Sequence, residues 1–141
     1  MKTPEPGQQI PEWSLPMTPT TIVSTAIATR DWQDVHHDRD IAQAAGSKDI
    51  FMNILTSNGL VEKFVVDWLR QEFGRGDAEL KGIAIRLGAP AYPYDTLTFR
   101  GEVESVEDGI ATIKVVGAVS LGDHVTGTVR VSVVEPAGTT S

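Results

Sequence analysis

The chain has 141 residues, of which 40% are hydrophobic and 22% are charged, and this composition suits one globular domain with its own core. The net charge of −7 argues against nucleic acid as a partner and is unfavourable for polyanionic ligands, including a nucleotide-bearing cofactor. The absence of cysteine excludes disulfides and thiolate metal sites. No apolar run reaches the length of about eighteen residues that spans a membrane, and the N-terminal residues lack the apolar stretch of a signal peptide. We therefore expect a soluble, cytoplasmic protein.

Proline dominates the beginning of the chain. Residues 1–19 hold five of the eight prolines and are predicted to form an extended N-terminal arm. Trp13 and Leu15 of this arm could lie against the domain or a partner, and a partly ordered tail is an equal alternative. Residues 20–28 (TTIVSTAIA) are rich in β-branched side chains and are predicted to be the first strand of a single domain over residues 20–135. Residues 136–141 are expected to be a flexible tail.

The next segment, residues 29–38 (TRDWQDVHHD), is predicted to be a loop, and it contains two of the three histidines. Asp31 and His36 lie five residues apart in it. A carboxylate and an imidazole are the commonest partners for moving protons near neutral pH, so this segment is where we expect chemistry. Without further support, a turn or capping role for Asp31 and a packed polar role for His36 are the simpler readings.

A metal site is a second interpretation of this segment, with ligands from His36, His37, Asp38 and Asp40. Adjacent side chains on an extended chain point to opposite sides, and the remaining histidine, His124, lies far along the sequence. We therefore expect no metal, and a structural or interfacial role for His37.

One long amphipathic helix is the clearest secondary-structure prediction. A short helical turn over residues 40–46, closed by Gly46, comes before it. The helix itself is predicted over residues 56–73 and is stopped by Gly74 and Gly76, and a close backbone contact would explain Gly59 inside it. Its apolar residues repeat at three- and four-residue spacing: Val61, Phe64, Val65, Trp68 and Leu69.

The remainder of the chain is predicted to be strands, over residues 78–87, 96–106, 110–121 and 125–134. Glu107-Asp108-Gly109 indicates a hairpin, and Gly122-Asp123 joins the last two strands. A strand, a long helix and then about four strands predict an α+β fold in which an antiparallel sheet curls around the helix.

The Asp31–His36 pair also carries a family resemblance. It matches the Asp and the His of the motif in MaoC-like (R)-specific enoyl-CoA hydratases, although Asn-Pro is usual where this chain has Gln33 and Asp34, and Gly where it has Arg30. The resemblance implies the hotdog fold, in which one long central helix is wrapped by a curled antiparallel sheet. It also implies that Asp31 and His36 are the catalytic acid and base of a hydratase.

A closer resemblance exists within this family. The runs at residues 35–38 (VHHD), 49–56 (DIFMNILT) and 86–88 (RLG), with Tyr92-Pro93, are similar to the small subunit of heteromeric hydratases in actinobacterial steroid side-chain degradation. The resemblance implies a steroid 2-enoyl-CoA substrate and a second MaoC-like subunit in a heterodimer or heterotetramer. No cofactor is implied, because coenzyme A is part of the substrate.

The segment entering the helix is the remaining candidate for the site. Residues 52–55 (MNIL) correspond to a His-Gly-Met-Leu run in which, by resemblance, a backbone amide holds the thioester oxygen. The oxyanion and substrate-positioning candidates are therefore Asn53, Ile54 and Ser57, with helix capping as the alternative for Ser57. Two other functions stay open: a hotdog acyl-CoA thioesterase, and a non-catalytic subunit that completes a partner's acyl-CoA pocket.

Overall fold

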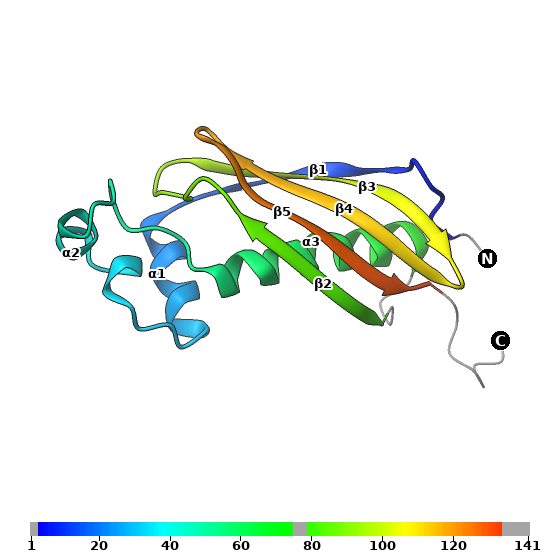
Figure 1. Ribbon diagram of the computed structural model, residues 1–141, viewed down its shortest axis with the longest axis horizontal. Coiled ribbons are helices and arrows are strands. Elements are labelled where there is room, and N and C mark those ends of the chain that lie inside the picture. The colour runs from blue at the N-terminus through cyan, green and yellow to red at the C-terminus, as the bar shows by residue number, and fades with distance from the viewer. Residues whose placement is uncertain (1–2, 75–78, 134–141) are drawn as a thin grey trace.

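The computed structural model describes residues 3–74 and 79–133, which form one sheet, one long helix and a group of short helices (Figure 1). The elements in chain order are β1 (Gln9–Pro16), α1 (Pro19–Ala28), a 3-10 turn (Asp34–His36), α2 (Arg39–Ala44), α3 (Ile54–Phe73), β2 (Leu80–Leu87), β3 (Thr96–Glu107), β4 (Ile110–Val119) and β5 (Gly122–Ser132).

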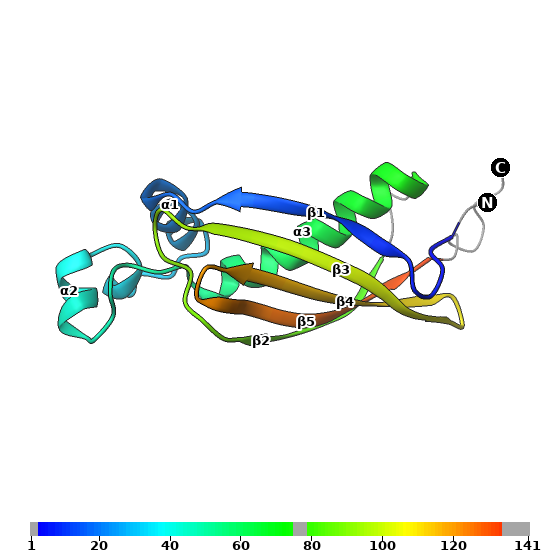
Figure 2. The same ribbon diagram turned by 90° about the horizontal axis from the view of Figure 1, so that it is seen from above.

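The five strands form a single antiparallel sheet in the order β1-β3-β4-β5-β2. The sheet curls, and α3 lies along its inner face (Figure 2), while α1 and α2 lie together at one end. Inward residues alternate along the central strand β4, where Ala111, Ile113 and Val115 are buried. This arrangement confirms the expected α+β architecture.

Helix α3 confirms the prediction of a central helix and begins two residues earlier than predicted, at Ile54. The side chain of Asn53 caps this end by accepting a hydrogen bond from the Thr56 amide. At the other end Gly74 adopts the left-handed conformation (φ 66°), which ends the helix. The predicted apolar stripe is buried against the sheet: Val61, Phe64, Val65, Trp68 and Leu69.

Three stacked aromatic rings pack the helix against the sheet. Phe64 of α3 stacks on Phe99 of β3 with ring centroids 5.6 Å apart, and Trp13 of β1 stacks on Phe99 at 5.5 Å. Packed aromatic pairs of this kind contribute about 0.5–1.5 kcal/mol beyond their buried area. The edge strand β1 is thus held by the core as well as by its pairing with β3.

The prediction of a strand over residues 20–28 is wrong, because this segment is helix α1. Thr18 caps it by accepting from the Thr21 amide at 3.0 Å, and Pro19 occupies the first turn, where a missing N–H is tolerated. Ile22 and Ala26, four residues apart, are the buried side chains, so tertiary burial at helical spacing overrides the β propensity of the sequence.

Part of the proline-rich segment takes the place of that strand in the sheet. Gln9–Pro16 is extended, as predicted, and pairs with β3 as edge strand β1, with a register shift between Ile10 and Trp13. Pro11 lies at this irregularity and Pro16 at the end of the strand, the positions where a sheet tolerates proline. The division of the chain at residue 19 stays a prediction, but the sheet includes residues from the N-terminal side of it.

The hairpin between β3 and β4 is confirmed, since Asp108 (φ 52°) and Gly109 (φ 74°) form its two-residue turn. The next turn differs from the prediction: Ser120 and Leu121 form it, and Gly122 and Asp123 belong to β5. The carboxylate of Asp95 fixes this turn by accepting from the Ser120 hydroxyl at 2.6 Å and from its amide.

The proposed close contact at Gly59 is also wrong, because beyond its chain neighbours and the nearby backbone of α3 no described atom lies within 4 Å of the position a Cβ would take. The predicted strand ends at residues 78 and 134, the predicted second stop at Gly76 and the predicted tail at 136–141 lie outside the described residues.

Candidate active site

The Asp/His segment leaves α1 through a tight reversal of the chain. Arg30 has a left-handed backbone (φ 58°), and the Asp31 amide donates to the carbonyl of Ala26 at 2.9 Å. The 3-10 turn that follows presents His36 on the same side as Asp31, so the five-residue spacing places both side chains together.

The structure brings the two predicted catalytic side chains into contact. His36 Nε2 lies 3.4 Å from Asp31 Oδ2, and the side chains are 7% and 17% exposed, respectively. Both carboxylate oxygens accept further hydrogen bonds, Oδ1 from the Gln33 amide at 3.2 Å and Oδ2 from Asn53 Nδ2 at 3.3 Å. The carboxylate is therefore held in one orientation, nearly out of solvent.

The other nitrogen of His36 fixes its tautomer. Nδ1 lies 2.8 Å from the carbonyl oxygen of Phe51, which can only accept, so Nδ1 carries the proton. The Phe51 ring also packs edge-on against the imidazole, with centroids 5.0 Å apart. Nε2 is consequently the nitrogen available for proton transfer, and it faces Asp31.

Asn53 connects this pair to α3. Its Oδ1 accepts from the amide and the hydroxyl of Thr56, while its Nδ2 donates to Thr29 Oγ1 at 2.7 Å and to Asp31 Oδ2. The side chain is 1% exposed. Asn53 thus caps the helix and orients the carboxylate, and its side chain has no free donor for a ligand.

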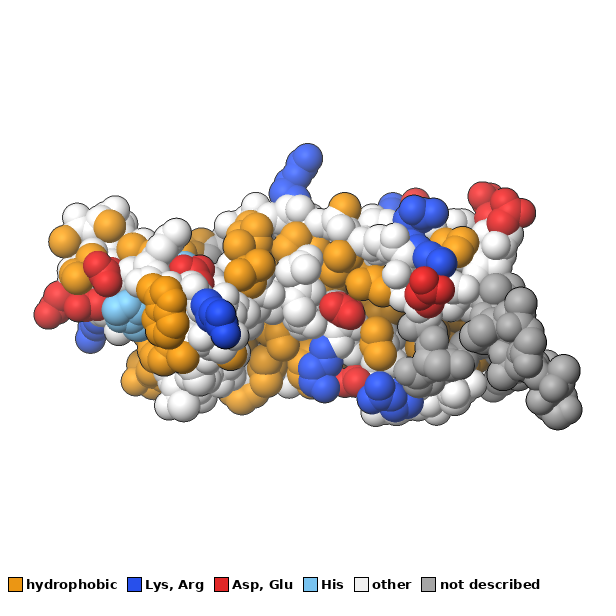
Figure 3. Space-filling view, turned by 90° about the horizontal axis from the view of Figure 1, so that it is seen from below, with side chains coloured by type: hydrophobic (Ala, Val, Ile, Leu, Met, Phe, Trp, Pro, Cys, Tyr) orange, Lys and Arg blue, Asp and Glu red, His pale blue; other side chains and the backbone are white. Residues whose placement is uncertain are grey.

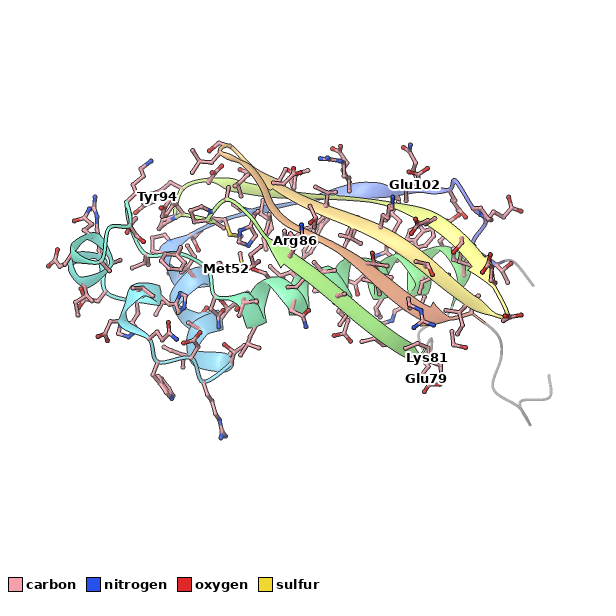
Figure 4. All side chains as sticks on the ribbon, viewed as in Figure 1. Met52, Glu79, Lys81, Arg86, Tyr94 and Glu102 are labelled. Atoms are coloured by element: carbon pink, nitrogen blue, oxygen red, sulfur yellow. The ribbon has the colours of Figure 1, made fainter. Side chains whose placement is uncertain are left out.

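Asp31 and His36 face a cleft of about 300 Å³. One wall comes from the Asp/His loop and the segment entering α3, near Met52 (Figure 4). The opposite wall comes from the segment that follows β2, together with the first residues of β5. The lining residues are Asp31, Gln33, His36, Phe51, Met52, Ile54, Leu87, Gly88, Ala89, Pro90 and His124.

The first amides of α3 are unpaired beside this cleft. In the described part of the chain, the amides of Ile54 and Leu55 donate to no carbonyl or side-chain oxygen. Unpaired amides at a helix N-terminus favour a partial negative charge. Because Ile54 lines the cleft, its amide is the candidate donor to a developing oxyanion.

The predicted candidate Ser57 does not face the cleft: it is fully buried, and its Oγ lies 2.8 Å from Nε2 of His124. The other nitrogen of His124 lies 2.7 Å from the carbonyl oxygen of Ala89. Burial lowers the pKa of His124 below its usual value of 6.5, and the hydrogen bond to Ala89 only partly opposes this effect. His124 is therefore neutral at pH 7.

The sequence alone predicts no role for His124, because it lies far along the chain from the Asp/His segment; the structure brings it to Ser57 across 67 residues. The available signal was a histidine at the start of a strand with apolar alternation, and that pattern does not reveal what it meets. His37, in contrast, is partly exposed and contacts Asp34 at 3.5 Å. Among the described residues, no group of three His, Asp or Glu side chains is arranged to hold a metal.

Large apolar side chains are exposed on the elements around the cleft. Trp32 is 65% exposed, Leu55 53%, Ile54 52%, Ile27 49% and Leu87 41%. Figure 3 shows hydrophobic side chains gathered on the side of the molecule seen from below.

None of the helices in the described residues has the length and hydropathy of a membrane span.

The family model for the MaoC-like domain matches residues 2–125. The chain belongs to the MaoC-like family. It is 59% identical over 126 residues to the 3-oxo-4,17-pregnadiene-20-carboxyl-CoA hydratase beta subunit of Mycobacterium tuberculosis, which covers 89% of this chain and 94% of that protein. The family resemblance drawn from the sequence is thereby confirmed.

Solved structures agree with this membership. A chain in the crystal structure of the ChsH1-ChsH2 complex from M. tuberculosis superposes with a TM-score of 0.85 at 58% identity, covering 91% of this MaoC-like chain and 97% of that one. The (R)-hydratase from A. caviae involved in PHA biosynthesis superposes with a TM-score of 0.78 at 19% identity, over 95% of this chain and 100% of that one. The hotdog fold predicted from the sequence is confirmed.

Proposed function

We propose that this chain is a catalytic subunit of an enoyl-CoA hydratase, which adds water across the double bond of a 2-enoyl-CoA thioester. The observation that carries the proposal is the Asp31–His36 pair, with 3.4 Å between Oδ2 and Nε2, facing a cleft beside unpaired helix amides. A relative of 59% identity is named as the beta subunit of a CoA-thioester hydratase, which supports the reaction class.

The chemistry assigned to the pair is general acid–base catalysis. A water molecule hydrogen-bonded to both Asp31 and His36 Nε2 loses one proton to this pair as its oxygen bonds to Cβ of the substrate. The pair returns one proton to Cα, so the sum is addition of H and OH across the double bond. Nε2 is the imidazole atom assigned to this exchange, since Nδ1 is bound to Phe51.

Negative charge develops on the thioester oxygen during the reaction. We assign its stabilisation to the Ile54 amide, because Ile54 lines the cleft and its N–H is unpaired within the described residues. The side chains of Asn53 and Ser57 are buried and bonded to Asp31 and His124, respectively, so we give them positioning roles instead of substrate contacts.

The proposed substrate is a bulky steroid side-chain acyl-CoA of steroid or cholesterol catabolism, because the relative is named for a pregnadiene carboxyl-CoA. The proposed partner is a second MaoC-like subunit in a heterodimer or heterotetramer. The matched chain of 58% identity occurs in a two-component complex, and the exposed Trp32, Leu55 and Leu87 provide apolar surface near the cleft. The reaction needs no cofactor, and the proposal places the protein in the cytoplasm with its CoA substrates.

The test is hydration of a panel of 2-enoyl-CoA esters, from short chains to a steroid side-chain thioester, followed by loss of the conjugated enoyl absorbance. The chain is measured alone and with the MaoC-like protein encoded beside it. Hydration that favours the steroid ester supports the proposal. Release of free thiol from saturated acyl-CoA, without hydration, would indicate a thioesterase and contradict it.

A further inference from the structure

His124 lies where β5, α3 and the segment after β2 meet, and the proposed chemistry gives it no role. It is the third residue of β5 and is 2% exposed. It lines the same cleft as Asp31 and His36. Both of its ring nitrogens are within hydrogen-bond distance of atoms from other segments, Ser57 in α3 and Ala89 after β2.

The partners of His124 allow a single proton arrangement at neutral pH. The Ala89 carbonyl can only accept, so Nδ1 carries the proton and donates it at 2.7 Å. Nε2 of the neutral ring is then an acceptor, and the Ser57 hydroxyl donates to it at 2.8 Å. The ring therefore has a fixed tautomer and orientation, and its Nε2 lone pair is already occupied by Ser57.

These bonds join the two walls of the cleft. On one side, the segment at residues 88–90 is held to β5 by Gly88 N to His124 O at 2.8 Å and by Ala89 N to Asp123 O at 2.9 Å. The His124 ring extends this connection to the first turn of α3 through Ser57. The Ser57 amide in turn donates to the carbonyl of Asn53 at 3.2 Å.

The connection continues to the catalytic carboxylate, because Asn53 Nδ2 donates to Asp31 Oδ2. A continuous hydrogen-bonded path therefore leads from the wall at residues 88–90, through His124 and Ser57, to the residue that holds Asp31. The gap between this wall and the Asp31–His36 pair is the space that a thioester would have to enter.

We propose that His124, acting through Ser57, is a positioning residue that sets this gap by fixing the wall at residues 88–90 against the first turn of α3. The proposal rests on the hydratase function proposed above. His124 transfers no proton in this account. Its effect is on the placement of the substrate, and small displacements of a reacting group, near 1 Å, reduce rates by about 100-fold.

The test uses the assembled complex with its MaoC-like partner and compares His124→Asn, Ser57→Ala and the double variant. Asparagine places an amide N–H near the position of Nδ1, so it keeps a donor for Ala89 and loses the bond to Ser57. Each single variant is expected to lower kcat for enoyl-CoA hydration by about 10- to 100-fold while KM changes less than about threefold. The double variant is expected to be no slower than the slower single one, because both changes remove the same bond.

Val131→Ala is the matched control for a loss of stability alone. Val131 is buried in β5, seven residues beyond His124, and outside the cleft. Its variant should be destabilised with an unchanged kcat per folded molecule. If the His124→Asn chain does not fold, Ser57→Ala alone tests the proposal. This variant removes one hydroxyl group and with it the bond to His124 Nε2.

The outcomes separate this proposal from the function on which it rests. A wild-type complex that hydrates no enoyl-CoA overturns the proposed function and the positioning role together. An active wild type whose His124 and Ser57 variants keep kcat, or lose no more than Val131→Ala does, overturns the positioning role alone. Losses that multiply in the double variant contradict the shared bond.

Discussion

Asn53 gives the sharpest prediction, because one side chain caps α3 and orients Asp31. Asn53→Ala removes the cap, worth about 1 kcal/mol. It also removes the hydrogen bonds to Thr29 Oγ1 and Asp31 Oδ2, worth about 1 kcal/mol each when buried. The free energy of unfolding should therefore fall by about 2–3 kcal/mol.

Asn53→Ser separates the two roles. Serine is as good a helix cap as asparagine, so the capping contribution is kept. Its hydroxyl is too short to take over the bonds from Nδ2 to Thr29 and Asp31. We therefore expect a loss of stability about 1 kcal/mol smaller than for Asn53→Ala. We expect a similar fall in kcat for both variants, by about 10- to 100-fold, since Asp31 Oδ2 loses its amide donor in each.

Stability is measured by urea unfolding of the isolated chain, and kcat by loss of enoyl absorbance in the assembled complex. Val131→Ala again controls for stability without contact to the cleft. Equal destabilisation by Ala and Ser would refute the capping assignment. Wild-type kcat in the Ser variant would refute the claim that Asn53 orients the catalytic carboxylate.

Three further predictions concern stability. Gly59→Ala should raise the free energy of unfolding in urea by about 0.5–1 kcal/mol, because the added Cβ meets no described atom within 4 Å other than its chain neighbours and the nearby backbone of α3; a decrease in the free energy of unfolding would contradict this open space. Gly88→Ala should lower it by about 1–3 kcal/mol and slow hydration, because its Cβ would collide with the carbonyl oxygen of Asp123; wild-type values for both would contradict the close pairing. Folding lowers the pKa of His124 below 6.5, so on acidification the unfolded chain binds a proton at this residue at a higher pH than the folded chain does. The stabilising contribution of His124 is therefore complete above pH 6.5 and is lost as the pH falls toward the pKa of the folded state. Thermal unfolding of wild type and His124→Asn from about pH 8 to about pH 5 should show a steeper fall for the wild type, and parallel curves would contradict the buried neutral ring.

Local signals in the sequence were sufficient for the long helix and the first hairpin. The stripe from Val61 to Leu69 has helical spacing, Gly74 provides the left-handed stop, and Asp108-Gly109 is a turn that only a few residue pairs favour. Residues 20–28 were mispredicted because their β-branched composition was weighed without the cap at Thr18 and without the burial of α1 at the end of the sheet.

The candidate site was predictable only in part, and for a physical reason. Asp31 and His36 are close in sequence, so a motif with a spacing of five residues identifies them. The other contacts of the site join residues that are distant in the sequence: 22 residues separate Asn53 from Asp31, and 35 residues separate His124 from Ala89. Contacts of this range depend on how α3, β5 and the segment after β2 pack, and no local pattern encodes that packing.

The central claim is that the Asp31–His36 pair of this chain performs the hydration. Its most direct test is the rate of enoyl-CoA hydration by the assembled complex carrying Asp31→Asn, an isosteric change that can still accept from the Gln33 amide. We predict a loss of about 1,000-fold in kcat, with binding of the acyl-CoA and assembly with the partner unchanged. A folded, assembled Asp31→Asn complex that hydrates at the wild-type rate would contradict the account and place the chemistry on the partner subunit.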